Sequence, residues 1–121
     1  MPCEILLVED SLFARQSIAR YLRNSGSSVE EAADGESALE RIAGKMFRIV
    51  ITDLHLSGKI NGLEVMNRQK QVSADGGLIL VTAFGSVDVR KKVASLGASY
   101  FEKPLWLPDL LTEVERLCAR S

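Results

Sequence analysis

The sequence predicts an α/β fold in which a parallel sheet carries helices on both faces. Short apolar or β-branched runs alternate five times with stretches whose apolar residues recur at helical spacing, and the connections are short. Alternation of this kind implies a parallel sheet with helices on both faces and right-handed crossovers. Because the 121 residues contain no internal repeat or low-complexity linker, we expect a single domain over residues 1–121.

The third predicted strand is a continuous apolar run that ends in the carboxylate of Asp53. A run of this kind between turn residues is typical of a central strand buried on both faces. The fourth strand has the same character, whereas the second is more polar, which favours a place at the sheet edge. The expected strands cover residues 4–8, 28–32, 48–53, 78–82 and 99–102.

The first predicted helix has Ser11 as its N-cap and ends near Gly26. Its apolar residues fall four apart on one face: Ala14, Ile18 and Leu22. The other helices are expected over residues 35–44, from Gly62 past Met66, from Ser86 to Gly97, and over a stretch with Pro108 near its first turn. That last helix carries an apolar stripe of Leu107, Leu110, Leu111, Val114, Leu117 and Cys118.

Composition excludes several classes of protein. A net charge of −1 and a pI of about 5.8 argue against a nucleic-acid-binding surface. The longest aliphatic runs, residues 5–8 and 78–81, are too short for a membrane span, and the N-terminus does not resemble a signal peptide. We therefore expect a cytoplasmic protein. We interpret Cys3 and Cys118 as reduced thiols in preference to a structural disulfide.

Chemically active residues lie within about two residues of the ends of four predicted strands. They are Glu9, Asp10, Asp53, Thr82 and Lys103, and the parallel topology places them along one edge of the sheet. Three neighbouring carboxylates repel one another unless a cation joins them, and Mg²⁺ with oxygen ligands fits such a site. A lysine and a hydroxyl beside an acidic metal site are the groups that a transferring phosphoryl group requires.

These residues give the chain a specific resemblance. Val8-Glu9-Asp10, Asp53-Leu54, Thr82-Ala83 and Lys103-Pro104, in this order at successive strand ends, resemble the response regulator receiver domains of two-component signalling, the CheY-like superfamily. The resemblance covers essentially the whole chain. It implies a flavodoxin-like, doubly wound (βα)5 fold with strand order 2-1-3-4-5.

The resemblance also implies roles. Asp53 would be the phosphoacceptor, receiving its phosphoryl group from a phosphohistidine of a sensor histidine kinase or phosphotransfer domain. The ligands of Mg²⁺ would be Glu9, Asp10, Asp53 and the backbone carbonyl of His55. The phosphoryl group would be held by Thr82, Ala83 and Lys103. Tyr100 and Pro104 would belong to the switch, with a cis Lys103-Pro104 bond. The alternative for Tyr100 is a fixed, half-buried aromatic.

Phosphorylation would remodel the surface formed by the fourth helix, fifth strand and fifth helix, which would control an output domain or partner and could form a homodimer. Such a domain phosphorylates itself and slowly dephosphorylates, so we expect no turnover of an external substrate. Arg90-Lys91-Lys92 could be a solvated helix face or a docking site, and Trp106 could be core or part of an exposed patch.

The chain departs from the family pattern after Asp53. Leu56-Ser57 stands where many members have Met-Pro, and the loop up to Gly62 is about one residue longer than usual, which leaves its conformation open. We hypothesise that the bulky Phe84 limits water access and prolongs the phosphorylated state.

Other functions fit less well. An aspartate-nucleophile phosphatase of the haloacid dehalogenase type needs a second Asp two residues after the first, where this chain has His55. A dinucleotide-binding protein needs a glycine-rich loop after the first strand, where this chain has acids. A degenerate receiver that binds proteins independently of phosphorylation remains an alternative.

Overall fold

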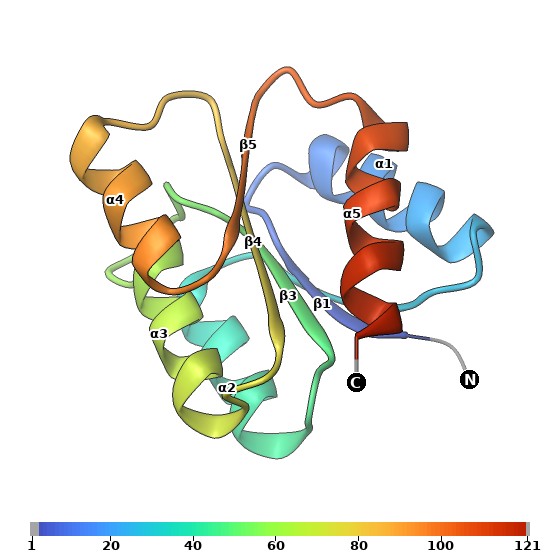
Figure 1. Ribbon diagram of the computed structural model, residues 1–121, viewed down its shortest axis with the longest axis horizontal. Helices are drawn as coiled ribbons and strands as arrows, with labels where there is room; N and C mark the ends of the chain where they lie inside the picture. Colours follow the sequence, from blue (N-terminus) through green and yellow to red (C-terminus); the bar gives the residue numbers. More distant parts are fainter. Residues whose placement is uncertain (1–2, 121) are drawn as a thin grey trace.

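The computed structural model describes residues 3–120. Its five strands are all parallel and follow the order β2-β1-β3-β4-β5 (Figure 1), as predicted. The strands are β1 (Glu4–Val8), β2 (Ser28–Ala32), β3 (Ile49–Asp53), β4 (Gly77–Thr82) and β5 (Ser99–Glu102). The helices are α1 (Leu12–Asn24), α2 (Gly35–Gly44), α3 (Gly62–Val72), α4 (Val87–Ser95) and α5 (Leu107–Ala119).

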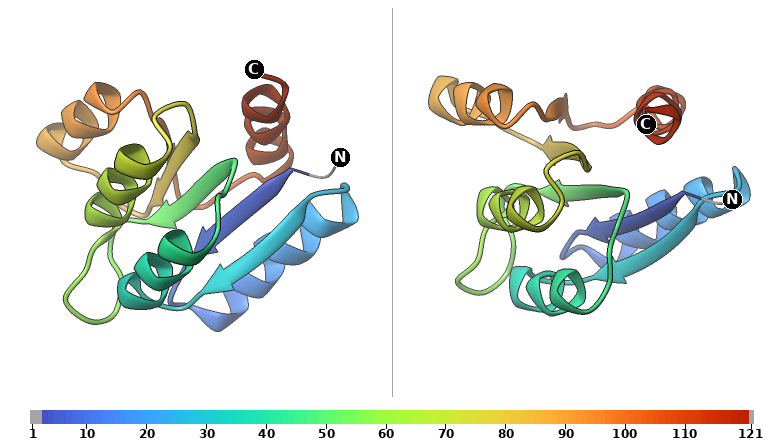
Figure 2. Two further views of the ribbon diagram at one scale, coloured as in Figure 1. Left: turned by 90° about the horizontal axis from the view of Figure 1, so that it is seen from below. Right: turned by 60° about the horizontal axis from the view of Figure 1, so that its bottom comes forward.

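The sheet separates two apolar cores. On one face α1 and α5 cover the side chains that alternate along β1 and β3, such as Ile5 and Ile49; on the other, α2, α3 and α4 cover Leu6 and Val50 (Figures 1 and 2). Because successive side chains of a strand point to opposite faces, a central strand that is apolar throughout supplies both cores at once. The fold therefore follows from the apolar runs that the sequence displays.

The predicted elements agree closely with those observed. β1, β2, α2 and β5 have the expected bounds, and β2 lies at the sheet edge. The side chain of Ser11 caps α1 by accepting from the backbone N–H of Ala14. β4 begins one residue earlier than predicted, at Gly77, where Leu117 of α5 packs closely over the backbone. None of the helices within residues 3–120 is long and apolar enough to cross a membrane.

The prediction of two reduced thiols is wrong, because Cys3 and Cys118 form a disulfide. Their Cα atoms lie 6.1 Å apart although 115 positions separate them in the chain. Cys3 precedes β1 in phase with Ile5 and Leu7, and Cys118 lies on the apolar stripe of α5, so both side chains pack against the same core. Helix α5 returns to the edge where the strands begin, and this brings the two residues together.

Candidate functional site

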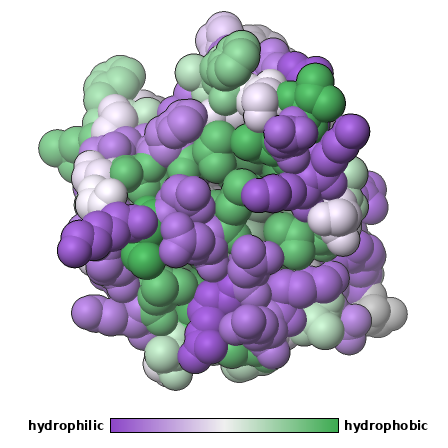
Figure 3. Space-filling view, turned by 90° about the vertical axis from the view of Figure 1, so that its left-hand side faces the viewer, coloured by the Kyte–Doolittle hydropathy of each residue, from purple (hydrophilic) through white to green (hydrophobic). Residues whose placement is uncertain are grey.

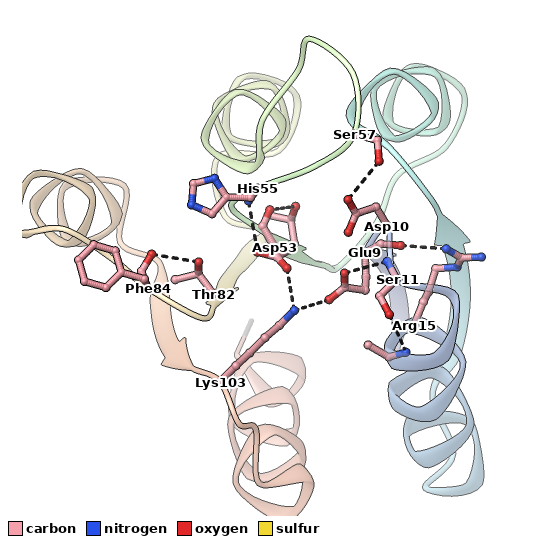
Figure 4. A network of polar contacts seen from close by, with 12 residues as sticks. Glu9, Asp10, Ser11, Arg15, Asp53, His55, Ser57, Thr82, Phe84 and Lys103 are labelled. Carbon is pink, nitrogen blue, oxygen red and sulfur yellow. Dashed lines mark hydrogen bonds and ion pairs between the residues drawn. The ribbon is translucent and has the colours of Figure 1, made fainter.

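The carboxyl ends of the strands bring the predicted site residues to one edge of the sheet. In the strand register Val8 is opposite Thr52, and Thr82 is opposite Glu102. Glu9 and Lys103, which follow β1 and β5, therefore lie beside Asp53 and Thr82, the last residues of β3 and β4. Figure 4 shows the result, with Glu9, Asp53 and Lys103 converging from β1, β3 and the end of β5.

Lys103 joins two of the carboxylates. Its Nζ donates to Glu9 Oε1 and to Asp53 Oδ2, at 2.7 Å in each case. Glu9 is almost fully buried, and only 11% of the Asp53 side chain is exposed. Burial by itself would lower the pKa of Lys103, but its hydrogen bonds to Asp53 and Glu9 outweigh that effect and raise the pKa. The ammonium group thus offsets part of the negative charge of the two carboxylates.

Asp10 is held differently. It is exposed, and its Oδ2 accepts a hydrogen bond of 3.1 Å from the hydroxyl of Ser57, in the loop between β3 and α3. Glu9 instead receives the backbone N–H of Ser11 at its Oε2, and Arg15 donates to its carbonyl oxygen. The carboxylates of Glu9 and Asp10 therefore have different hydrogen-bond partners, which the sequence pattern did not indicate.

Thr82 and His55 form longer hydrogen bonds at the same edge of the sheet. Thr82 is fully buried, and its hydroxyl donates to the carbonyl oxygen of Phe84 at 3.2 Å. The backbone N–H of His55 donates to Asp53 Oδ1 at 3.3 Å, while the residue is exposed. Phe84 is 74% exposed, and its ring points away from Asp53 (Figure 4). The hypothesis that it prolongs the phosphorylated state stays a prediction.

Gly62, a site residue that sequence reasoning noticed only as a helix start, closes the loop after Asp53. A Cβ at this position would collide with the carbonyl oxygen of Asp53, and the Gly62 N–H donates to the carbonyl of Leu54 at 2.9 Å. Thr52 adds a hydrogen bond from its hydroxyl to the same Asp53 oxygen. Only glycine allows α3 to begin this close to the end of β3. A glycine at a helix start is the signal that could have revealed this approach.

Tyr100 lies in β5, and Pro104 follows Lys103 just after it; their switching role stays a prediction. Tyr100 is half-buried, its hydroxyl donates to Glu102, and the Arg90 guanidinium lies 5.3 Å from its ring centroid. Gly85 leaves room for the ring, since a Cβ there would collide with the phenol oxygen. The Lys103-Pro104 bond is cis, as predicted. Trp106 is 67% exposed and so is not a core residue.

The donors at this edge fit Mg²⁺ chemically, because they are carboxylate and carbonyl oxygens. Within residues 3–120, however, no group of three or more His, Cys, Asp and Glu is arranged to hold a metal ion. The Lys103 ammonium lies between Glu9 and Asp53, where a cation joining these two carboxylates would lie. The ligand prediction of Glu9, Asp10, Asp53 and His55 therefore stays a prediction.

Solved structures of similar fold include the chemotaxis protein CheY4 of Vibrio cholerae, with a TM-score of 0.86 and 26% identity over 97% of this chain and 99% of that one. A CheY-like response regulator receiver domain protein from Methanospirillum hungatei gives a TM-score of 0.91 and 25% identity, over 98% and 94% of the two chains. Fold and site together define a CheY-like domain of the flavodoxin fold with a lysine and several acids at its carboxyl edge.

Sequence comparison identifies the family. The profile of the response regulator receiver domain matches residues 5–115, so the chain belongs to this family. Response regulator MprA of Mycolicibacterium vanbaalenii is 35% identical over 122 aligned residues, and that of Mycobacterium tuberculosis 34%. All of this chain is matched but only 52% and 53% of theirs, so the chain spans about half the length of these curated relatives.

Proposed function

We propose that this receiver domain accepts a phosphoryl group on Asp53 from the phosphohistidine of a sensor histidine kinase or a phosphotransfer domain. The observation that carries the proposal is the ion pair of Lys103 with Asp53 and Glu9, at 2.7 Å to each, at the carboxyl end of a central strand. Family membership supports it, since receiver domains are parts of response regulators. The same groups that now form this ion pair would serve the transfer.

Asp53 would be the nucleophile. A carboxylate oxygen of Asp53 attacks the phosphorus, the bond to the histidine nitrogen breaks, and the imidazole leaves with that electron pair. Lys103 then moves its ammonium donor from the carboxylate to a phosphoryl oxygen, and the Ala83 backbone would add a further donor. Mg²⁺ held by Glu9, Asp10, Asp53 and the carbonyl of His55 would supply charge neutralisation for the transferring group.

The acyl phosphate would bias a two-state surface. It adds roughly −1.5 to −2 charges and three acceptor oxygens, and the Thr82 hydroxyl could exchange its Phe84 carbonyl partner for one of them. Because Tyr100 packs against Gly85 in the loop after Thr82, movement of this loop would change the space for the ring. The affected surface is α4-β5-α5.

That surface has features suited to an output domain, a protein partner or a second copy of the chain. Phe84, in the loop before α4, and Val87, at its first position, are exposed. Hydrophobic residues lie among hydrophilic ones on the side of the molecule that carries α4 (Figure 3). We place the domain in the cytoplasm, where histidine kinases present their phosphohistidine. It would turn over only its own acyl phosphate.

Mass spectrometry of the intact protein tests the proposal. Incubation with acetyl phosphate and Mg²⁺ should add about 80 Da, the mass of one phosphoryl group, and Asp53→Asn should gain nothing. Chelation of Mg²⁺ should abolish the gain in the wild type. An unmodified wild type under all conditions would instead favour a phosphorylation-independent binding module.

A further inference from the structure

We propose that Ser57 is a positioning residue whose hydroxyl orients the Asp10 carboxylate for the divalent cation of the phosphoryl-transfer site. The inference rests on the proposed function. Its starting observation is the hydrogen bond of 3.1 Å from Ser57 Oγ to Asp10 Oδ2, between residues 47 positions apart (Figure 4). The other oxygen, Asp10 Oδ1, accepts no hydrogen bond from residues 3–120 and remains available to a cation.

Asp10 depends on this contact for its orientation. Glu9 is buried and is held by Lys103 and by the Ser11 N–H, whereas Asp10 is exposed. Among the described side chains, Ser57 alone forms a hydrogen bond with the Asp10 carboxylate. Without the hydroxyl, an exposed aspartate would sample several staggered rotamers, and binding a cation would have to select one of them.

The backbone that carries Ser57 is fixed to the beginning of α2. Ser57 forms a parallel β-bridge with Asp34, whose side chain caps α2 by accepting the Ser37 N–H at 2.7 Å. Gly58 follows with φ +88°, a conformation that favours glycine. This turn places the Lys59 N–H at 3.4 Å from the Glu36 carboxylate.

A close contact completes the attachment. Ile60 packs on Gly35 so tightly that a Cβ at Gly35 would lie 2.5 Å from the Ile60 Cβ. Contacts at positions 57, 59 and 60 thus join the loop to α2 before α3 begins. A hydroxyl on a backbone held in this way loses little freedom when it binds Asp10, so it can hold the carboxylate in one orientation.

This arrangement is the outer hydrogen bond that a metal-binding carboxylate requires. Partners of this kind orient the ligand, and their removal typically weakens metal affinity by 10–100-fold. Because Ser57 and Asp10 are both exposed, we expect the lower end of that range, about tenfold.

Calorimetric titration of Mg²⁺ into the folded, unphosphorylated protein tests the inference. Ser57→Thr and Ser57→Val introduce side chains of nearly the same shape that differ by a hydroxyl. Ser57→Thr should keep the Kd for Mg²⁺ within about threefold of the wild type, and Ser57→Val and Ser57→Ala should raise it by about tenfold. Ser17→Ala, an exposed serine on α1, should leave the Kd unchanged.

Thermal unfolding without Mg²⁺ separates orientation from general stability, since Ser57→Thr and Ser57→Val should then unfold at the same temperature. Equal Mg²⁺ affinities for these two variants, or tighter binding by Ser57→Val, would overturn the role of Ser57. If the wild type still gains a phosphoryl group on Asp53, the proposed function survives that result. A wild type that binds no Mg²⁺ overturns both.

Discussion

The two edges of the sheet are held together in different ways. At the edge where the strands end, reversible contacts predominate, with Lys103 between Glu9 and Asp53. At the edge where the strands begin, the Cys3–Cys118 disulfide joins β1 to the last turn of α5. Arg48 adds hydrogen bonds from its guanidinium to carbonyl oxygens of the chain at the same edge.

Helix α5 spans both edges, because it starts a few residues after Lys103 and ends beside Cys118. One end is covalently fixed, and the other follows a loop in which Trp106 is exposed. The covalent link therefore lies at the edge away from Asp53, and the edge that carries Asp53 is held by ion pairs that can change partners. This difference leads us to expect that any shift of α5 on phosphorylation is largest at its first turn.

The largest expected effect comes from breaking the fixed edge. A disulfide that closes a loop of about 100 residues contributes up to about 5 kcal/mol through the unfolded chain. Reduction, or Cys118→Ser, should therefore lower Tm by up to about 20 °C for a domain of this size. Differential scanning calorimetry with and without a dithiol reductant measures the change.

The control is reduction of the Cys118→Ser variant, which should have no further effect on Tm. At temperatures below the lowered Tm, acetyl phosphate should still phosphorylate Asp53 in the reduced wild type and in Cys118→Ser, because the disulfide lies at the opposite edge of the sheet. Equal Tm values for oxidised and reduced wild type would remove the contrast between the edges.

Gly62→Ala should disturb the edge that carries the site. The added Cβ would meet the Asp53 carbonyl oxygen, which belongs to the backbone and cannot move aside freely. Overpacking of this kind costs about 1–3 kcal/mol, and displacement of Asp53 should slow its phosphorylation as well. Urea unfolding and the rate of mass gain report the two effects.

Gly44→Ala is the matched control, because a Cβ at Gly44, at the end of α2, meets nothing within 4 Å. It should leave phosphorylation unchanged and stabilise the protein by about 0.4–1 kcal/mol. If both alanine variants behaved alike, the close approach of α3 to Asp53 would not matter for the site.

The sequence predicted the fold well because local signals agreed with one another. The apolar runs of β1, β3 and β4 indicated buried strands, and the polar β2 indicated an edge. The parallel topology then placed Glu9, Asp53 and Lys103 at one edge without any knowledge of their contacts. Apolar periodicity is a local property of the sequence and can be recognised without a structure, whereas the strand order 2-1-3-4-5 was expected from the resemblance to receiver domains.

The pairings that depend on three-dimensional approach could not be predicted in the same way. Ser57 meets Asp10 only because the loop after β3 attaches to α2, and nothing near either residue indicates that attachment. Cys3 and Cys118 gave a usable signal, since each lies in phase with an apolar stripe of one core. That signal was outweighed by the expectation that a cytoplasmic protein keeps its thiols reduced.

Of the three destabilising changes, Lys103→Met should have the smallest effect on stability. It leaves the carboxylates of Glu9 and Asp53 together without a cation, but part of the site is open to solvent, so we expect a loss of about 1–2 kcal/mol at neutral pH. Mg²⁺ should restore stability more in this variant than in the wild type. Lys91→Met, at an exposed position of α4, should change neither the free energy of unfolding by urea nor its increase on addition of Mg²⁺.

The pH dependence of this loss shows whether the ion pair causes it. The pKa of Lys103 is raised above 10.5 in the folded protein because its hydrogen bonds to Asp53 and Glu9 outweigh burial. The contribution of the pair is therefore fully present below pH 10.5 and is lost as the pH rises through the folded pKa. The stability difference between wild type and Lys103→Met should be constant around neutral pH and should shrink in alkaline solution. The guanidinium of Lys103→Arg stays charged in alkaline solution, so this variant should remain more stable than Lys103→Met there. If the wild type also remained more stable than Lys103→Met in alkaline solution, the loss would be due to packing of the lysine stem and not to the ion pair.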